Sequence, residues 1–322
     1  MKKILSLILA MCLVFALASV AGAQTLALNH VGATDHPYQD GSLKLAELVA
    51  EYTGGELTID VFPASQIASG AKAIEMVQTW TLDIAVESTM SLSNFVPEVG
   101  VLDLPFLFST KEDAFKVLDG PVGDKLEAAC EAQGFKILGW WDNGFRSIVS
   151  TKGIVDEPAD LKGLKIRTPE SQVFLTTFET LGAVPTAMAV SEVFSSMQLG
   201  TVDATENSDS NCIKNKYTDI CPYYSATKHI YTAEPVIMNL DTWNMLDASV
   251  QEALQKACDE ATAYQREKSL ALDEVNMQTV RDLGVELFIL EDASAFQAAC
   301  EPVYAAFPQY AEIIEMIKAE LQ

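Results

Sequence analysis

Residues 25–62 read TLALNHVGATDHPYQDGSLKLAELVAEYTGGELTIDVF, and this stretch decides the fold class. Thr25–Val31 is short and apolar, as strands are, whereas Ser42–Tyr52 carries the apolar spacing of a helix. A glycine pair ends that helix, and Leu57–Phe62 then alternates apolar and polar residues as a second strand does. A strand, a helix and a strand in this order predict a parallel sheet covered by helices.

The same alternation continues along the chain and restarts after Asn143-Gly144. Two successive α/β units of this kind predict two lobes. Leu102–Phe108 contains Pro105, which bars it from the centre of a sheet, so we expect an apolar loop or short strand packed in the core or between the lobes. The other predicted helices are Gly70–Trp80, Glu112–Leu118, Val122–Gln133, Ser171–Leu181 and Ser191–Leu199; the other predicted strands are Leu82–Glu87, Phe135–Trp141, Leu164–Thr168, Ala183–Ala187, Val202–Glu206 and Pro235–Leu240.

Ser249–Leu283 is the longest helical pattern and contains neither glycine nor proline. At 1.5 Å per residue such a helix would be about 50 Å long, which exceeds the breadth of one lobe. We therefore expect it to touch both lobes. A strand at Glu286–Leu290 and a final pair of helices complete the prediction.

The first 23 residues have the pattern of a secretory signal peptide. Lys2 and Lys3 precede the apolar run Ile4–Val20, and Ala21-Gly22-Ala23 is a small-residue cleavage site. We expect an exported protein that begins at Gln24; the alternative is a retained N-terminal anchor. Export permits disulfides, and a bridge between Cys212 and Cys221 stays open as one arrangement of the five remaining cysteines.

The composition restricts the partners. There are 21 Lys and Arg against 45 Asp and Glu, for a net charge of −24, and 49% of residues are hydrophobic. This acidity argues against nucleic acid and anionic lipid as partners. An anionic small ligand would need a local cation to overcome the repulsion.

Catalytic motifs are scarce in the sequence. It contains no GxSxG, GxGxxG or GxxxxGK motif, and its three histidines, His30, His36 and His229, have no metal-ligand spacing. Glu206 and Asp209 could bind calcium, but a solvated acidic turn is the simpler interpretation. We expect neither a metal nor a cofactor.

Arginine is rare, and two of the four arginines stand at informative places. Arg146 stands at the join between the two units, and Arg167 ends the strand that begins at Leu164. Ligands bind at the carboxyl ends of strands in open α/β sheets. A guanidinium can grip a carboxylate through two parallel hydrogen bonds. A surface salt bridge is the alternative role for each, and surface ion pairing is the simpler role for Arg266 and Arg281 in the long helix.

Several ordered motifs resemble one family, the periplasmic solute-binding subunits of the tripartite ATP-independent (TRAP) transporters, of the DctP type. The matching motifs span nearly all of the chain after residue 23: VFPASQI at Val61–Ile67, LDLPFLF at Leu102–Phe108, WWDNGFR at Trp140–Arg146, DLKGLKIRTPES at Asp160–Ser171, GAVPTAMAVSEVFSSMQLGTVDATEN at Gly182–Asn207, and His229.

The resemblance implies a two-lobed α/β binding protein with hinge strands and one long helix spanning both lobes. Lobe I would comprise residues 24–145 and 233–272, and lobe II residues 146–232 and 273–322. The implied role is a monomeric, non-enzymatic periplasmic protein that delivers a small organic acid to TRAP permease subunits. A ligand sensor for a receptor and, less favoured, an exported enzyme acting on organic acids are the alternatives.

The resemblance also assigns ligand-binding roles to five residues. Arg167 would clamp the carboxylate, steadied by Asn207, and Arg146 would be a second cation. Glu87 and His30 would contact the other end of the ligand from lobe I.

The chain also departs from the family's motifs. VDATENS at 202–208 replaces the family's usual VDGQENP, and the neutral Ala68–Ala71 argues against a sialic-acid ligand.

Overall fold

A ten-stranded sheet runs through the computed structural model, which describes residues 24–322; the predicted signal peptide lies outside these residues. The order of the main path is β2-β1-β3-β9-β4-β7-β5-β6, with β8 paired to β4 and β10 paired to β8. The first unit places β1 parallel to β2 and β3, as predicted from the strand–helix–strand pattern. The strands are β1 (Gln24–His30), β2 (Leu57–Phe62), β3 (Ile84–Val86), β4 (Phe135–Ser150), β5 (Lys165–Thr168), β6 (Val184–Ala187), β7 (Ala204–Ser208), β8 (Tyr223–Ala226), β9 (Tyr231–Asn239) and β10 (Glu286–Ile289).

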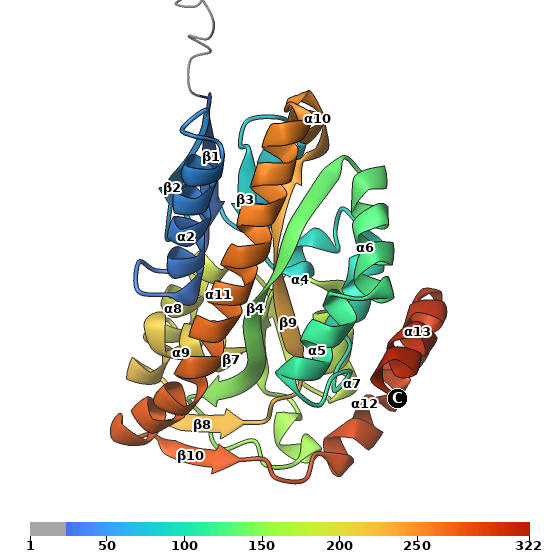
Figure 1. The fold of residues 1–322 in the computed structure, drawn as a ribbon. Helices are drawn as coiled ribbons and strands as arrows, with labels where there is room; N and C mark the ends of the chain where they lie inside the picture. The colour runs from blue at the N-terminus through green and yellow to red at the C-terminus, as the bar shows by residue number, and fades with distance from the viewer. Residues whose placement is uncertain (1–23) are drawn as a thin grey trace, which may run out of the picture.

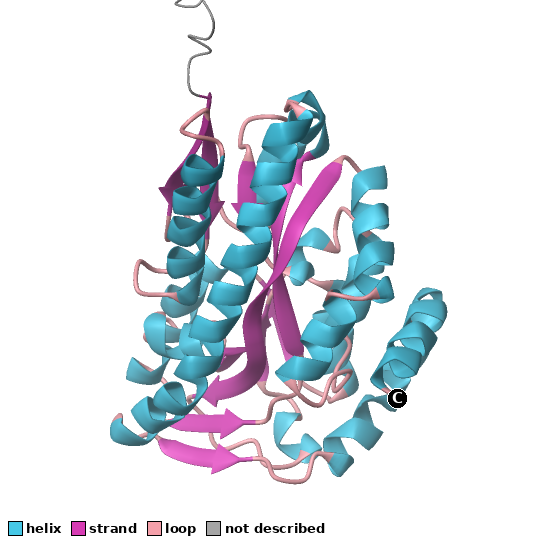
Figure 2. Cartoon of the chain, viewed as in Figure 1, coloured by secondary structure: helices cyan, strands magenta, loops and turns pink. Residues whose placement is uncertain are grey.

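Helices pack around this sheet (Figures 1 and 2). They are α2 (Pro37–Tyr52), α3 (Ala71–Gln78), α4 (Thr89–Leu92), α5 (Lys111–Leu118), α6 (Pro121–Ala132), α7 (Gln172–Thr180), α8 (Val190–Gln198), α9 (Asp209–Lys214), α10 (Leu240–Met245), α11 (Ala248–Asp282), α12 (Ser294–Ala306) and α13 (Ala311–Leu321), with 3-10 helices η1 (Pro97–Asp103), η2 (Pro158–Leu161), η3 (Tyr217–Asp219) and η4 (Pro308–Tyr310). The predicted helices are confirmed to within a few residues.

Helix α11 confirms the prediction of a long helix that touches both lobes. It runs beside α2 and along β4, and its later turns reach α9 in the second unit (Figure 1). Gln265 fixes it to the sheet, because its side chain donates to the backbone oxygen of Asp142 and accepts from the backbone nitrogen, each at 2.8 Å.

Strand β4 is more than twice as long as the predicted Phe135–Trp141 and links the two units. Its Phe135–Phe145 part pairs with β9, whereas its last five residues pair with β7 and β8. The prediction ended this strand before the polar Asp142-Asn143-Gly144 segment, but the strand continues through the segment with a bulge. Gly144 has φ +98°, a conformation that glycine adopts without a Cβ penalty. The lobes are therefore joined by strands β4 and β9.

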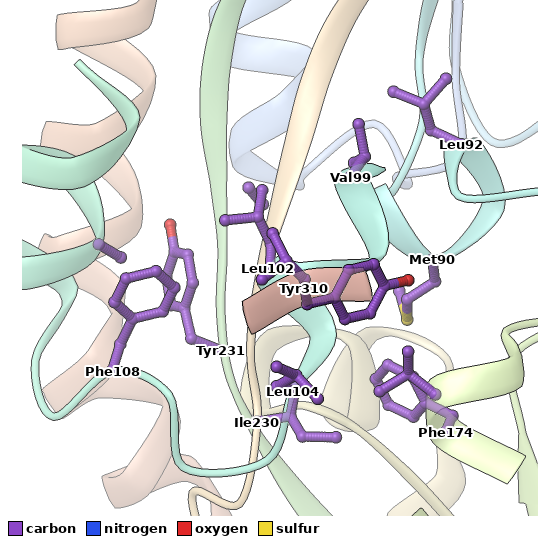
Figure 3. Close-up of a cluster of buried hydrophobic side chains, with 14 of the residues drawn as sticks. Met90, Leu92, Val99, Leu102, Leu104, Phe108, Phe174, Ile230, Tyr231 and Tyr310 are labelled. Carbon is purple, nitrogen blue, oxygen red and sulfur yellow. The ribbon is translucent and has the colours of Figure 1, made fainter. Parts of the chain in front are cut away.

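The motif LDLPFLF is not a strand. Pro97–Asp103 forms η1, and the rest is a loop whose Leu104 and Phe108 are buried in the largest hydrophobic cluster. Figure 3 shows Leu104 beside Ile230 and in the same cluster as Phe174 of α7. The cluster thus contains side chains of both units, which confirms the predicted packing role of this motif.

Some segments depart from the predicted boundaries. Strand β8 was not predicted, and β7 and β9 are shifted from the expected Val202–Glu206 and Pro235–Leu240. Helix α13, which the predicted boundaries assign to lobe II, packs against α5 and α6 of lobe I.

The two tryptophans of β4 face opposite sides of the strand: Trp140 donates to Glu127 and Trp141 to Thr262.

Within residues 24–322, no helix combines the length and the apolar character needed to cross a membrane. The five cysteines of this part of the chain, Cys212 and Cys221 included, are buried free thiols. Burial raises the pKa of the Cys221 thiol to about 12, so it is held protonated and unreactive.

Candidate ligand-binding site

A cavity of about 230 Å³ lies between the two units and is lined by polar and charged side chains from both. Four of the five predicted site residues line it: Glu87, Arg146, Arg167 and Asn207. Sequence reasoning missed several further polar residues of its wall, Asn211, Glu170 and Glu234 among them.

Arg167 presents an uncompensated positive charge to this cavity. It ends β5, and its side chain is buried; Nε and Nη2 donate to the backbone oxygen of Met188 at 3.1 and 2.6 Å. It forms no ion pair with any residue in the described part of the chain. Burial lowers the pKa of Arg167, because the charged form is deprived of solvent.

Asn207 stands on β7, beside β5, and its amide group is held in place. Its Oδ1 accepts hydrogen bonds from the backbone of Ser208 at 2.9 Å and from Nδ2 of Asn211 at 3.2 Å. Its own Nδ2 is left for another acceptor.

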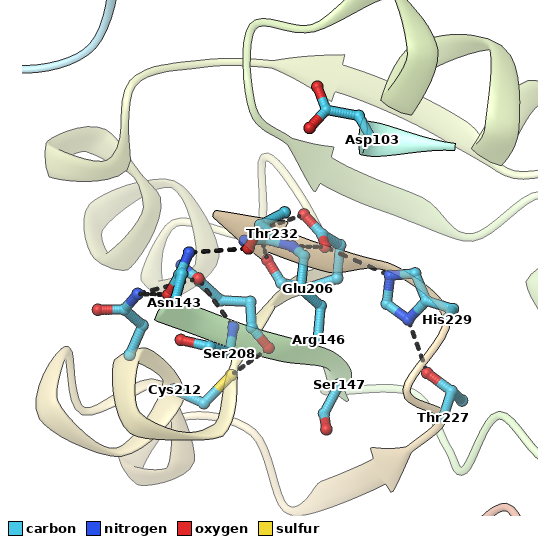
Figure 4. A network of polar contacts seen from close by, with 12 residues as sticks. Asp103, Asn143, Arg146, Ser147, Glu206, Ser208, Cys212, Thr227, His229 and Thr232 are labelled. Atoms are coloured by element: carbon cyan, nitrogen blue, oxygen red, sulfur yellow. Dashed lines mark hydrogen bonds and ion pairs between the residues drawn. The ribbon is translucent and has the colours of Figure 1, made fainter. Parts of the chain in front are cut away.

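Arg146 is neither a surface ion pair nor a free cation. Its Nε donates to Oε2 of Glu206, and Nη2 donates to Oε1 of Glu206 at 2.8 Å and to the Glu206 backbone oxygen at 3.0 Å (Figure 4). The Arg146 guanidinium also lies 5.2 Å from the centre of the Phe174 ring. Only Nη1 lacks a protein partner.

The prediction that Glu206 belongs to a solvated acidic turn is therefore wrong. It is fully buried on β7, and Nε2 of His229 lies 3.3 Å from its Oε2, while the other ring nitrogen of His229 contacts Thr227 at 2.8 Å. Burial opposes the charge of Glu206, but Arg146 more than offsets this and lowers the pKa of Glu206 to about 2. No cluster of residues suited to a metal ion occurs in residues 24–322.

Two buried carboxyl groups form the lobe I side of the cavity. Glu87 follows β3, and its Oε2 accepts from the backbone of Gly70 at 3.0 Å, while Oε1 has no partner. Glu234 lies on β9, and its Oε2 also has no partner. Burial raises the pKa of Glu87 well above its usual range and that of Glu234 to about 8.

His30 is the predicted site residue that does not line the cavity. It ends β1, is buried, and contacts Oε1 of Gln39 through Nε2 at 2.9 Å. Burial lowers its pKa, which keeps the ring neutral.

The raised pKa of Glu234 predicts a pH dependence of stability. A carboxyl group whose pKa rises on folding favours the native state at low pH, and this contribution is lost as the pH rises from the unfolded pKa to the native pKa. We expect the free energy of unfolding of the ligand-free protein to fall as the pH rises from about 4.5 to about 8. Asp103, whose pKa burial raises to about 7, adds to the same trend.

Denaturant unfolding at pH 5 and pH 8 measures this fall. Glu234→Gln should reduce it, because the amide does not titrate, whereas the same substitution at the exposed Glu47 should not. An unchanged pH dependence in Glu234→Gln would contradict the assignment.

Two α/β lobes joined by strands, with a polar cavity between them and no metal centre in the described residues, define the class of two-lobed solute-binding proteins. The model of bacterial extracellular solute-binding protein family 7, DctP, matches residues 28–310. The chain belongs to this family, which confirms the resemblance in its motifs.

Two characterised relatives are similar over most of their length. The 2,3-diketo-L-gulonate-binding periplasmic protein YiaO of Escherichia coli (strain K12) is 33% identical over 286 residues, which cover 88% of this chain and 87% of that protein. The C4-dicarboxylate-binding periplasmic protein DctP of Rhodobacter capsulatus is 32% identical over 316 residues, 96% and 95% of the two chains.

Solved structures of TRAP periplasmic solute-binding proteins have the same fold. That from Polaromonas sp. JS666, bound to D-erythronate, has a TM-score of 0.89 and 32% identity, and the match covers 92% of this chain and 98% of that one. That from Roseobacter denitrificans, with bound β-D-glucuronate, has a TM-score of 0.89 and 29% identity over 92% and 99% of the chains.

Proposed function

We propose that the protein captures a small organic acid in this cavity and delivers it to the permease subunits of a TRAP transporter. Export to the periplasm, with removal of residues 1–23, is part of the proposal. The observation that carries it is the state of Arg167, a buried guanidinium at the cavity wall without a carboxylate partner. Because an unpaired buried charge is costly, the site favours an anion.

The ligand carboxylate would meet Arg167 and the amide of Asn207, since both line the cavity from neighbouring strands. Arg146 contributes a different interaction. Glu206 already neutralises its charge, so Arg146 offers the unpaired Nη1–H as a hydrogen-bond donor rather than a second full positive charge. Each charge-assisted bond of this kind contributes about 1.5–3 kcal/mol.

Closure of the lobes would bury the ligand. Many contacts connect the proposed lobes, residues 24–145 with 233–272 and residues 146–232 with 273–322, and three of them involve residues of the loops and helices near the cavity. Asn94 donates to the backbone oxygen of Glu170 at 2.8 Å, Lys214 pairs with Asp35, and Ser171 donates to Asp103 at 3.4 Å. Strands β4 and β9, which cross between the lobes, would be the hinge. A ligand bridging Arg167 and the lobe I wall would favour this closed form.

The cavity is suited to binding rather than catalysis. Its wall includes serines, but none of the three histidines is a base for them: His30 contacts Gln39, Nδ1 of His36 accepts from the backbone of Tyr38, and His229 lies against Glu206. A serine nucleophile needs an adjacent base for acyl transfer. We therefore propose that the ligand leaves unchanged.

Calorimetry and mass spectrometry test the proposed function. Native mass spectrometry of the protein purified after export should show the chain beginning at Gln24 with one bound acid. Titration calorimetry with that acid should give one site per chain, and nuclear magnetic resonance of the mixture should show no product. Turnover of the acid, or the absence of binding for every small carboxylate tried, would overturn the proposal.

A further inference from the structure

The charges around the cavity are unevenly divided between its two sides. Glu206 compensates Arg146, so Arg167 is the one guanidinium of the wall without an acidic partner. Three carboxyl groups line the cavity without a cationic partner among the described residues: Glu87 and Glu234 on the lobe I side, and Glu170, which follows β5 in the second unit and whose Oε2 lies near Gly70 of lobe I. The cavity is thus complementary to a molecule with an anion at one end and hydrogen-bond donors at the other.

The two carboxyl groups lie next to each other because their strands are neighbours. β3 and β9 are antiparallel partners, and the backbone nitrogen of Glu87 donates to the oxygen of Pro235, the residue after Glu234, at 3.4 Å. Both side chains are 2% exposed. Oε1 of Glu87 and Oε2 of Glu234 have no partner in the protein, so both can accept hydrogen bonds from a bound molecule.

We propose that Glu234 acts with Glu87 as a specificity determinant that recognises hydroxyl groups on the ligand, and that the ligand is a polyhydroxylated monocarboxylate rather than a dicarboxylate. This inference rests on the proposed function, because it assumes that the carboxylate of the ligand lies at Arg167.

A dicarboxylate fits this arrangement poorly. Its second carboxylate would be buried against two carboxyl groups, and no cation among the described residues on that side of the cavity would compensate its charge. The protein would then differ from the Rhodobacter capsulatus relative, whose name specifies C4-dicarboxylates.

Hydroxyl groups fit better than an ammonium group or an aromatic ring. Burial and mutual repulsion hold the Glu87 carboxyl towards its protonated form, which can donate to and accept from hydroxyls but does not attract a cation. The residues that line the cavity include no Trp, Tyr or Phe on which a flat ligand could stack. Serines 65, 69, 88 and 91 add further hydroxyls to the wall.

Two matched ligand series test the proposal by calorimetry on the wild-type protein. D-erythronate, succinate, butyrate and 4-aminobutyrate share four carbons; D-gluconate, adipate, hexanoate and 6-aminohexanoate share six. We expect the hydroxylated acid to bind at least about tenfold more tightly than the other three members of its series. Equal or tighter binding of the dicarboxylate would overturn the inference, as would tightest binding of the amino acid or equal binding of the unsubstituted acid. If no acid of either series binds, the proposed function fails as well.

Substitutions at Glu234 and Glu87 test whether these residues produce the selectivity for the hydroxylated acid. Glu234→Gln and Glu87→Gln should each weaken binding of the hydroxylated acid about tenfold or more and bring succinate or adipate closer to it. Glu127→Gln is the control, because Glu127 is a half-buried glutamate outside this cavity, and it should leave the affinities unchanged. Thermal unfolding verifies that each variant is folded. Unchanged selectivity in folded Glu234→Gln would overturn the role of Glu234.

Discussion

Replacing Arg167 by alanine is expected to abolish measurable ligand binding while the melting temperature of the ligand-free protein stays nearly unchanged. Two charge-assisted hydrogen bonds to a carboxylate contribute about 3–6 kcal/mol together, so their loss weakens binding roughly a hundredfold to ten-thousandfold. Stability changes little for a separate reason. The guanidinium is buried without a carboxylate, so its removal relieves a desolvation cost that offsets the lost contact to Met188.

Arg266→Ala is the control for this experiment. Arg266 also forms a fork, to Asp119 at 2.6 and 2.8 Å, but it lies on α11 away from the cavity. Its removal should leave calorimetric affinity intact. Arg167→Lys should bind more weakly than wild type but better than Arg167→Ala, because lysine keeps the charge and loses the planar fork. Wild-type affinity in Arg167→Ala would refute the carboxylate clamp.

The fold was predictable from sequence where local patterns agree with tertiary packing. The first strand–helix–strand unit and α11 are such cases, since alternation in Leu57–Phe62 and an unbroken helical pattern each have one physical reading. Strand β4 was predicted too short because the polar Asp142 and Asn143 interrupt its apolar sequence. In the structure, two side chains of α11 satisfy the polar groups of Asp142. Gln265 exchanges hydrogen bonds with the Asp142 backbone, and Ser269 donates to the Asp142 carboxylate at 2.6 Å. Those partners are more than 100 residues away in the sequence, where no local pattern reveals them.

In the candidate site too, what a local sequence feature marks was predictable, and what depends on contacts between distant segments was not. Arg167 was predicted to line the cleft because it ends an apolar strand, which is a local feature, whereas Asn207 was assigned only through the family resemblance. The pairing of Arg146 with Glu206 was not predicted, since it depends on β4 and β7 being antiparallel neighbours. Glu234 had a usable signal, a lone glutamate within the otherwise uncharged strand Tyr231–Asn239, but its contribution to the cavity required the position of β3 beside β9.

The buried pair of Arg146 and Glu206 leads to the second large expected effect, this time on stability. Glu206→Gln keeps the shape of the side chain but removes its charge, which leaves the Arg146 guanidinium buried without compensation. Breaking one partner of a buried ion pair costs about 3–5 kcal/mol. We expect Glu206→Gln to lower the free energy of unfolding, measured by urea denaturation at pH 7, by about this amount.

The pair of Arg266 and Asp119, whose acidic partner is exposed, provides the control. It is also an arginine–carboxylate fork, but Asp119 is 57% exposed, so Asp119→Asn should cost no more than about 1 kcal/mol. The pH dependence gives an independent signature. Because the pKa of Glu206 is lowered to about 2, its contribution is present above about pH 4.5 and is lost as the pH falls towards 2. Glu206→Gln should lack this acid-induced loss. Equal, small losses in the two variants would show that the pair contributes no more than a surface salt bridge, and that Arg146 is not held in the cavity wall by Glu206.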